Sequence, residues 1–500
     1  MAQRQGALLL LRRGMAVCSR CSAGGSAGAL AGSEGAAQQA WRALGRGGCG
    51  AQRAWSSLRA APGRDAAGAW RSFASRLHAT LAAEANGAAG AAAGAAAASA
   101  GAAAAAGPPG AALAAGVPDA ARRAMAWWLG GCTAWVFAMV VIGGVTRLTR
   151  SGLSMTDWKF TGERPPLTQA DWEAEFEKYK QSPEFRLAHS HMGVEDFKFI
   201  FWWEYGHRMW GRVLGLVFAL PTAAFAVKGA VNGPLAGRLG LLFAMGGAQG
   251  LVGWWMVRSG LEEPEDRHAV PRVSPYRLAA HLTSAFAIYA TLAWTTLTLA
   301  APASALAAAP PAAAAAAAAL RRRALPLAAL VGVTAVSGAF VAGKDAGRAF
   351  NTFPKMNGQW VPDDYFSGLP PLRNAFENTA AVQLHHRALA LTTLAAVAAL
   401  FASSRGAPLP AAPRRWLAAL AAATGAQVAL GITTLLLHVP VPLGAAHQAG
   451  AMLVFASALG LLHSVRPAAA SRAARAVSRA APPLGLAATA AVGYAVTQMK

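Results

Sequence analysis

The sequence predicts an all-α polytopic membrane protein with eight transmembrane helices, arranged as two tandem four-helix bundles related by an internal repeat. Three observations lead to this fold class. Hydrophobic residues make up 55% of the 500 residues and charged residues only 13%, a balance typical of integral membrane proteins. Apolar runs of about 18 to 25 residues recur along the chain, each long enough to cross a bilayer. Motifs in the first four runs also recur in the last four.

The N-terminal part has the composition of a targeting segment. Residues 1–80 hold eleven arginines, no lysine and only two acids, Glu34 and Asp65. This pattern is typical of a mitochondrial transit peptide, which we place at residues 1–81. Residues 82–120 are almost entirely alanine and glycine, so we expect a linker there. Because these arginines account for much of the net charge of +23, the charge does not indicate a nucleic-acid partner.

The apolar runs give the order of the spans. We expect them at residues 125–146, 200–226, 239–257, 277–300, 325–343, 379–402, 416–437 and 444–465. They define an N-terminal unit (121–300), an Ala/Pro linker with a basic loop (301–324), a C-terminal unit (325–466) and a tail (467–500). The loops on one side are basic and free of acids after Asp119. By the positive-inside rule that side faces inward, so both termini are expected inside.

The internal repeat is visible in three pairs of motifs. "EYGHR" in the second span matches "QLHHR" in the sixth, "GGAQGLVG" in the third matches "TGAQVALG" in the seventh, and "RLAAHLTSA" in the fourth matches "PLGAAHQAGA" in the eighth. The separations are similar, at 179 residues for His207 and His386, 178 for Gln249 and Gln427, and 166 for His281 and His447. Similar separations in three spans predict two copies of one four-helix unit in the same orientation.

Four histidines hold equivalent positions in the repeat. His207, His281, His386 and His447 all lie near the beginning of even-numbered spans, at one depth near the outer face, two in each unit. Two imidazoles on facing helices suit a planar cofactor with an axial ligand on each side of its iron. A single buried histidine would more often be a packing residue, and zinc would lack a recurring third ligand. His385 adjoins His386, but the repeat and Arg387 favour His386 as the ligand.

Glu204 is the single carboxylate inside the predicted spans. It precedes His207 by three residues, so both side chains share one helix face, whereas the second unit has the neutral Gln383 at the same place. A group that can gain or lose a proton suits a unit in which bonds change. The alternative is a structural ion pair with Arg208, and the two roles are compatible.

The motifs "FKFIFWWEYGHRMWGR", "PRVSPYRLAAHLTSA", "SGAFVAGKDAGRAFNTFPKM" and "QVALGITTLLLHVPVPLGAAHQ" resemble the mitochondrial and proteobacterial branch of the heme A synthase family. The resemblance implies an oxidoreductase that converts the C8 methyl group of heme O to a formyl group, through the alcohol, to make heme A for cytochrome c oxidase. It also implies that His386 and His447 bind a permanent heme b and that His207 and His281 bind the substrate heme. From its position beside His207, Glu204 is predicted to be catalytic.

The same resemblance implies a protein of the mitochondrial inner membrane, and in a mitochondrion the inner side deduced from the basic loops is the matrix, so both termini are expected there. Its expected partners are a ferredoxin with its reductase as electron source, heme O synthase, cytochrome c oxidase assembly factors and further copies of this chain. Basic residues near the outer helix ends are candidates for holding the heme propionates: Arg147, Arg150, Arg208, Lys344, Arg348 and Arg387.

Two other classes of protein share part of this pattern. A diheme b-type electron-transfer protein would also place histidine pairs in bundles, but it would not need an acid beside one heme only. A transporter would explain the repeat and the buried Glu204, but not four histidines at one depth.

Overall fold

The computed structural model describes residues 109–159, 161–263, 270–302, 304 and 306–467. Within these ranges the structure contains helices and no strands. Eight of the helices are long and apolar enough to cross a membrane, as the sequence predicts. The expected transit peptide, most of the expected linker at 82–120 and all but the first residue of the tail lie outside the described residues.

The eight long helices fall into two groups of four in chain order. The first bundle consists of α6 (Asp119–Leu148), α9 (Val194–Val227), α10 (Gly233–Arg258) and α11 (Pro275–Ala300). The second bundle consists of α12 (Pro311–Gly343), α14 (Thr379–Ser403), α15 (Ala411–Leu436) and α16 (Val441–Ser464). Short helices precede or connect them: α5 (Pro109–Ala114), α7 (Gln169–Lys180), α8 (Pro183–Ala188), α13 (Pro371–Glu377) and the 3-10 turns η1 (Ala346–Arg348) and η2 (Asp363–Phe366).

Several helices begin before their predicted spans: α6, α9 and α10 by six residues each and α12 by fourteen. The sequence places the fifth span at 325–343, but α12 begins at Pro311, inside the segment expected to be a linker. Alanine has the highest helix propensity, and a proline at the first helical position favours a helix start, so this Ala-rich segment extends the helix. Likewise α9 begins at Val194, six residues before the predicted span, with Glu195 and Asp196 in its first turn.

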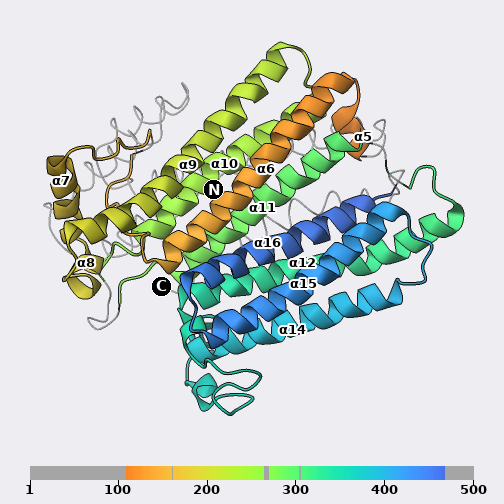
Figure 1. The fold of residues 1–500 in the computed structure, drawn as a ribbon. Helices are drawn as coiled ribbons and strands as arrows, with labels where there is room; N and C mark the ends of the chain where they lie inside the picture. The colour runs from red at the N-terminus through yellow and green to blue at the C-terminus, as the bar shows by residue number, and fades with distance from the viewer. Residues whose placement is uncertain (1–108, 160, 264–269, 303, 305, 468–500) are drawn as a thin grey trace, which may run out of the picture. The chain divides into compact units, whose positions relative to one another are not determined.

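Both bundles have the same pattern of neighbouring helices. In the first, α6 and α10 each pack against both α9 and α11; in the second, α12 and α15 each pack against both α14 and α16. Figure 1 shows the two groups of long helices. The bundles meet where α6 packs on α16, α11 on α12, and α11 on α16. This arrangement is compatible with the internal repeat, which stays a prediction.

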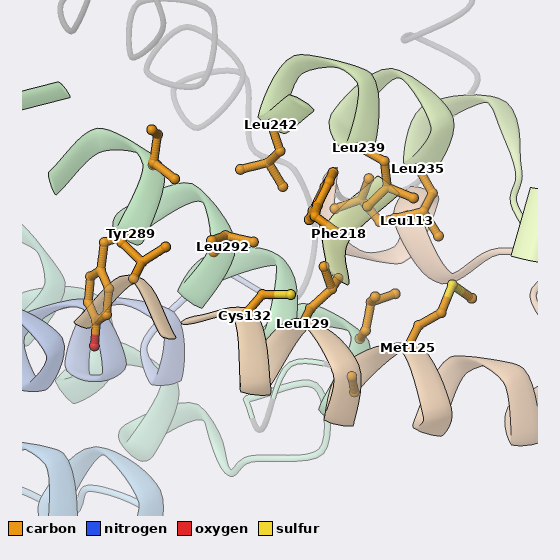
Figure 2. Packing of buried hydrophobic residues seen from close by; sticks show 14 of the residues in the cluster. Leu113, Met125, Leu129, Cys132, Phe218, Leu235, Leu239, Leu242, Tyr289 and Leu292 are labelled. Atoms are coloured by element: carbon orange, nitrogen blue, oxygen red, sulfur yellow. The ribbon is translucent and has the colours of Figure 1, made fainter. Parts of the chain in front are cut away.

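The core of the first bundle is a cluster of buried apolar side chains from α5 and all four long helices (Figure 2). The labelled members are Leu113, Met125, Leu129, Cys132, Phe218, Leu235, Leu239, Leu242, Tyr289 and Leu292. A second cluster joins α12, α14, α15 and α16. Because lipid is as apolar as these side chains, close packing and hydrogen bonds stabilise such bundles more than the hydrophobic effect does.

The side chain of Gln448 links α16 of the second bundle to α6 of the first. Gln448 of α16 donates a hydrogen bond from Nε2 to the Val140 carbonyl oxygen of α6, at 2.8 Å. Its amide lies directly over Gly144, where a Cβ atom would overlap the Gln448 oxygen. The absence of a side chain at Gly144 therefore lets α16 reach the backbone of α6.

The segment between α6 and α9 (residues 149–193), called the outer segment below, packs on the first turns of α9. Trp172, Phe176 and Tyr179 of α7 are buried against Phe197 and Phe201, with the rings of Tyr179 and Phe197 stacked at 5.2 Å. This packing holds the segment over the part of α9 that precedes Glu204.

A buried polar group lies inside this outer segment. The Tyr179 hydroxyl lies 3.0 Å from Glu184 Oε2 and 2.7 Å from His189 Nδ1, and Glu184 is only 5% exposed. Burial raises the pKa of Glu184 to about 7, because a carboxylate loses its hydration there. The outer segment therefore contains a carboxyl group that titrates near neutral pH.

This raised pKa predicts a pH-dependent stability of the outer segment. The folded state retains the Glu184 proton up to about pH 7, whereas the ordinary value is 4.5. The contribution of Glu184 to stability is therefore fully present below pH 4.5 and is lost as the pH rises to about 7. Glu184→Gln cannot ionise, so it should remove this decline and slow proteolysis of the segment at pH 8. The measurement is the cleavage rate within residues 149–198 between pH 5 and pH 8.

The matched control is Glu177→Gln, which changes an exposed glutamate of the same segment that pairs with Lys180. It should retain the wild-type pH dependence. An unchanged decline in Glu184→Gln would show that another group causes it.

Candidate functional site

The four predicted histidines lie at the same end of the two bundles. His207, His281, His386 and His447 are in the N-terminal parts of α9, α11, α14 and α16. Each ring packs against a glycine near the C-terminal end of the spanning helix that precedes it. A Cβ atom at that glycine would come within 2.7 to 3.2 Å of the ring Cε1 atom: Gly143 with His207, Gly253 with His281, Gly338 with His386, and Gly431 with His447.

The histidines are associated in two pairs. In the first bundle α9 and α11, which carry His207 and His281, both pack against α6 and α10. In the second, α14 and α16, which carry His386 and His447, both pack against α12 and α15. All four residues are partly buried. Each bundle therefore contains one of the two predicted pairs. That each pair shares a cofactor stays a prediction.

Glutamines hold the histidine of the last helix in each bundle. Gln249 Nε2 lies 3.2 Å from His281 Nδ1 and donates to the His281 carbonyl oxygen at 3.0 Å. Gln427 makes the same two contacts with His447, at 3.1 and 2.8 Å. The sequence analysis identified these glutamines as repeat positions but gave them no role.

The neighbouring His385 and His386 have different surroundings. His386 Nδ1 lies 2.7 Å from the Ser337 hydroxyl of α12, inside the bundle. His385 Nε2 instead lies 3.3 Å from the hydroxyl of Tyr365, in η2 outside the spanning helices. The ring of His386 is therefore the one placed beside His447.

The remaining histidines within the described residues lie elsewhere. His189 contacts Tyr179, and His191 and His438 are exposed in connecting segments. His463 is buried near the other end of α16, between Thr298 and Arg466. His268 lies outside the described residues.

Glu204 is buried and satisfied by three donors. Its Oε2 atom accepts from the Ser154 hydroxyl and the Met155 backbone N–H, each at 2.8 Å, and Oε1 accepts from Arg208 at 2.5 Å. Arg208 also donates to the carbonyl oxygens of Met155 and Asp157. The pair thus attaches α9 to the segment that follows α6.

Gln383 makes the corresponding attachment in the second bundle. Its Oε1 atom accepts from Arg387 at 2.8 Å, and its Nε2 atom donates to the carbonyl oxygens of Ala346 and Ala349. The amide thus links α14 to the segment that follows α12. Structural anchoring is common to both positions, whereas the ability to ionise belongs to Glu204 alone.

The predicted propionate-binding residues differ in their partners. Arg147, Arg150 and Arg272 converge on Asp345, with N···O distances of 3.0, 3.8 and 3.5 Å. Lys344 is half-buried beside them, and burial together with Arg272 lowers its pKa. Asp345 and Glu377, which interacts with Lys344, are outnumbered by these four cations, so an excess of positive charge remains between the bundles at this end.

Arg208 donates to Glu204 and Arg387 donates to Gln383, and both also donate to backbone carbonyl groups. Arg348 is exposed in η1. The sequence analysis did not include Arg272 or Asp345 in this group.

These surroundings are compatible with an iron porphyrin in each bundle. The histidines come as pairs, and no three histidine, cysteine or carboxylate side chains gather to hold a metal ion within the described ranges. His207 Nδ1 is a buried nitrogen without a hydrogen-bond partner there. Imidazole rings in facing pairs are suitable axial ligands for a heme iron.

Sequence reasoning missed the glycines that face the rings. Their signal is present, because Gly253 and Gly431 each follow the matched glutamine by four residues in "GGAQGLVG" and "TGAQVALG". Only the packed structure shows that the position faces an imidazole of the next helix.

Comparison with known proteins shows similarity over most of the spanning region. Residues 126–459 match the COX15-CtaA family model, described as cytochrome oxidase assembly protein. The chain is 55% identical over 349 residues to heme A synthase COX15 of Arabidopsis thaliana, covering 69% of this chain and 75% of that protein.

Two further relatives agree. The identity is 47% over 347 residues with heme A synthase COX15 of Homo sapiens (69% of this chain, 83% of the relative) and 46% over 346 residues with heme A synthase of Nitrosospira multiformis (69% and 94%). Extended similarity of this kind, together with the matched spans, shows that the chain belongs to the COX15-CtaA family of cytochrome oxidase assembly proteins.

Proposed function

We propose that this chain is a heme A synthase, a membrane oxidoreductase that converts the C8 methyl group of heme O to the formyl group of heme A. The observation that carries the proposal is the pair of partly buried histidines at the same end of each bundle, in a chain whose relatives are heme A synthases. One pair can bind the substrate heme while the other binds a cofactor heme.

The two bundles are assigned different tasks. His207 and His281 would bind heme O, and His386 and His447 would bind heme b, which when present supplies a one-electron redox centre. The acid beside His207 supports this assignment, because the second bundle has the neutral Gln383 in its place. The cationic group Arg147, Arg150, Arg272 and Lys344 would attract the propionates.

Glu204 is proposed to act on protons during the oxidation. With an external oxidant taking up two electrons in each step, the methyl group would first be oxidised to an alcohol and then to a gem-diol, which loses water to give the aldehyde. Glu204 would accept a proton released at the substrate carbon or position the water molecule. Its three hydrogen bonds also anchor the outer segment, so the structure supports a second, stabilising role for the same side chain.

We place the protein in the mitochondrial inner membrane with both termini in the matrix, which protection of a C-terminal tag from external protease would test. A ferredoxin and its reductase are the proposed electron source. Heme O synthase, oxidase assembly factors and further copies of the chain are proposed partners. A diheme b-type electron-transfer protein is the alternative function, since it would use the same histidine pairs.

Heme analysis separates these functions. Cells that lack cytochrome c oxidase should contain heme A when this chain is present and heme O without heme A when it is absent. The measurement is chromatography of extracted hemes. A purified protein that carries heme b alone, in cells whose heme A content does not depend on it, would favour the electron-transfer protein.

Glu204→Gln tests the proton-transfer role. The carbonyl oxygen of glutamine can still accept from Arg208, as Gln383 accepts from Arg387, while its NH2 group would face the Met155 N–H and lower the protein level somewhat. The protein that folds should retain heme b. Loss of a general base commonly costs about a hundredfold or more in rate. Heme O or the alcohol should therefore accumulate at the expense of heme A, measured together with the protein level.

Gln383→Glu is the matched control. It would place a carboxylate against the carbonyl oxygens of Ala346 and Ala349, so it should lower the protein level and the heme b content. Normal heme A output from Glu204→Gln would remove the carboxylate from the mechanism.

Single substitutions distinguish the adjacent histidines. His386→Ala and His447→Ala should each yield protein with little heme b, because an axial ligand is missing. His385→Ala should retain heme b, since its ring contacts Tyr365 outside the bundle. The absorbance spectrum of each purified variant reports the heme b content, and loss of heme b only in His385→Ala would reverse the ligand assignment.

A further inference from the structure

The four histidines differ in what their Nδ1 atom contacts. Gln249 and Gln427 lie beside this atom in His281 and His447, and Ser337 lies beside it in His386. His207 Nδ1 is buried and has no hydrogen-bond partner among the described residues. One proposed substrate-heme ligand therefore lacks a contact that its counterpart in the second bundle has.

The contact of His386 fixes the position of its ring proton. The Ser337 hydroxyl donates its single hydrogen to the Thr334 carbonyl oxygen, at 2.7 Å. At the same time its oxygen lies 2.7 Å from His386 Nδ1. Because the hydroxyl has no second hydrogen to donate, it accepts the N–H of Nδ1, and Nε2 keeps its lone pair. An unprotonated Nε2 atom is what an iron ligand requires.

The first bundle has no hydroxyl at the matching place. Ser337 directly precedes Gly338, the glycine against the His386 ring, and Ile142 directly precedes Gly143, the glycine against the His207 ring. An isoleucine side chain cannot accept a hydrogen bond. The ring of His207 is positioned by packing alone.

We propose that Ser337 is a positioning residue that makes His386 a permanent heme ligand, whereas Ile142 leaves His207 free to release the heme bound beside it. This inference rests on the proposed function, in which the first bundle must take up heme O and release heme A. A hydrogen bond at Nδ1 orients the ring and raises the basicity of a ligating imidazole. Its absence weakens the ligand in the bundle where heme must be exchanged.

The first test compares heme b retention in the purified full-length protein. Ser337→Ala should lose heme b to excess apomyoglobin about fivefold faster than the wild type, the factor expected for one neutral hydrogen bond of about 1 kcal/mol. Its heme b reduction potential should become more positive, because the ligand is less basic. Ser337→Thr keeps the hydroxyl and should restore both values.

Ser457→Ala is the matched control, since that hydroxyl only donates to the Leu453 carbonyl oxygen within α16. It should leave both values at the wild-type level. Wild-type heme release and potential in Ser337→Ala would overturn the proposal for the second bundle.

The reciprocal test introduces a hydroxyl beside His207. Ile142→Ser should slow the transfer of heme O and heme A to apomyoglobin, with Val141→Ser as a control of equal polarity on a different face of α6. Unchanged transfer from Ile142→Ser would overturn the proposal for the first bundle. A protein that never contains heme O or A would instead contradict the proposed function, and the heme b comparison would still test Ser337.

Discussion

The close approach of each histidine-bearing helix to the spanning helix before it is the constraint on which the site depends. At four places a glycine faces an imidazole, and any side chain there would push the ring away. The contact sets the ring's depth and its distance from the opposite helix without using a polar group. Contacts of this apolar kind suit a bilayer, because a polar group left without a hydrogen-bond partner is costly there. Packing of small residues is a main way to bring helices close together in lipid.

The chemistry of the two bundles differs although their framework is similar. Glu204 and Gln383 anchor equivalent connections, but only the first can carry a proton. Ser337 and Ile142 stand at the same place relative to a histidine, but only the serine offers a hydrogen-bond acceptor. Differences at single positions can therefore divide cofactor binding and substrate conversion between two copies of one architecture.

The number and order of the spanning helices could be predicted from the sequence, because they depend on apolar runs of many residues. The eight spans follow from apolar runs, and the pairing of histidines follows from their recurrence. The start of α12 was missed because Ala-rich sequence is equally suited to a linker and a helix. The roles of Ser337, Asp345 and Arg272 could not be foreseen, since each depends on side chains from different helices or loops. Two of the donors to Glu204, Ser154 and the Met155 N–H, were hidden for the same reason, whereas its pairing with Arg208 was visible in the i, i+4 spacing.

The hydrogen bond from Gln448 to Val140 has a further consequence. Gln448 directly follows His447, and Val140 lies one turn before Gly143 and Gly144, so a proposed heme b ligand and the packing surface of His207 share a single rigid connection. Separating the bundles would expose the amide and the carbonyl group to lipid with no water to replace the bond. A displacement of α16 away from α6 would therefore have to break this bond beside the glycine against which the His207 ring packs.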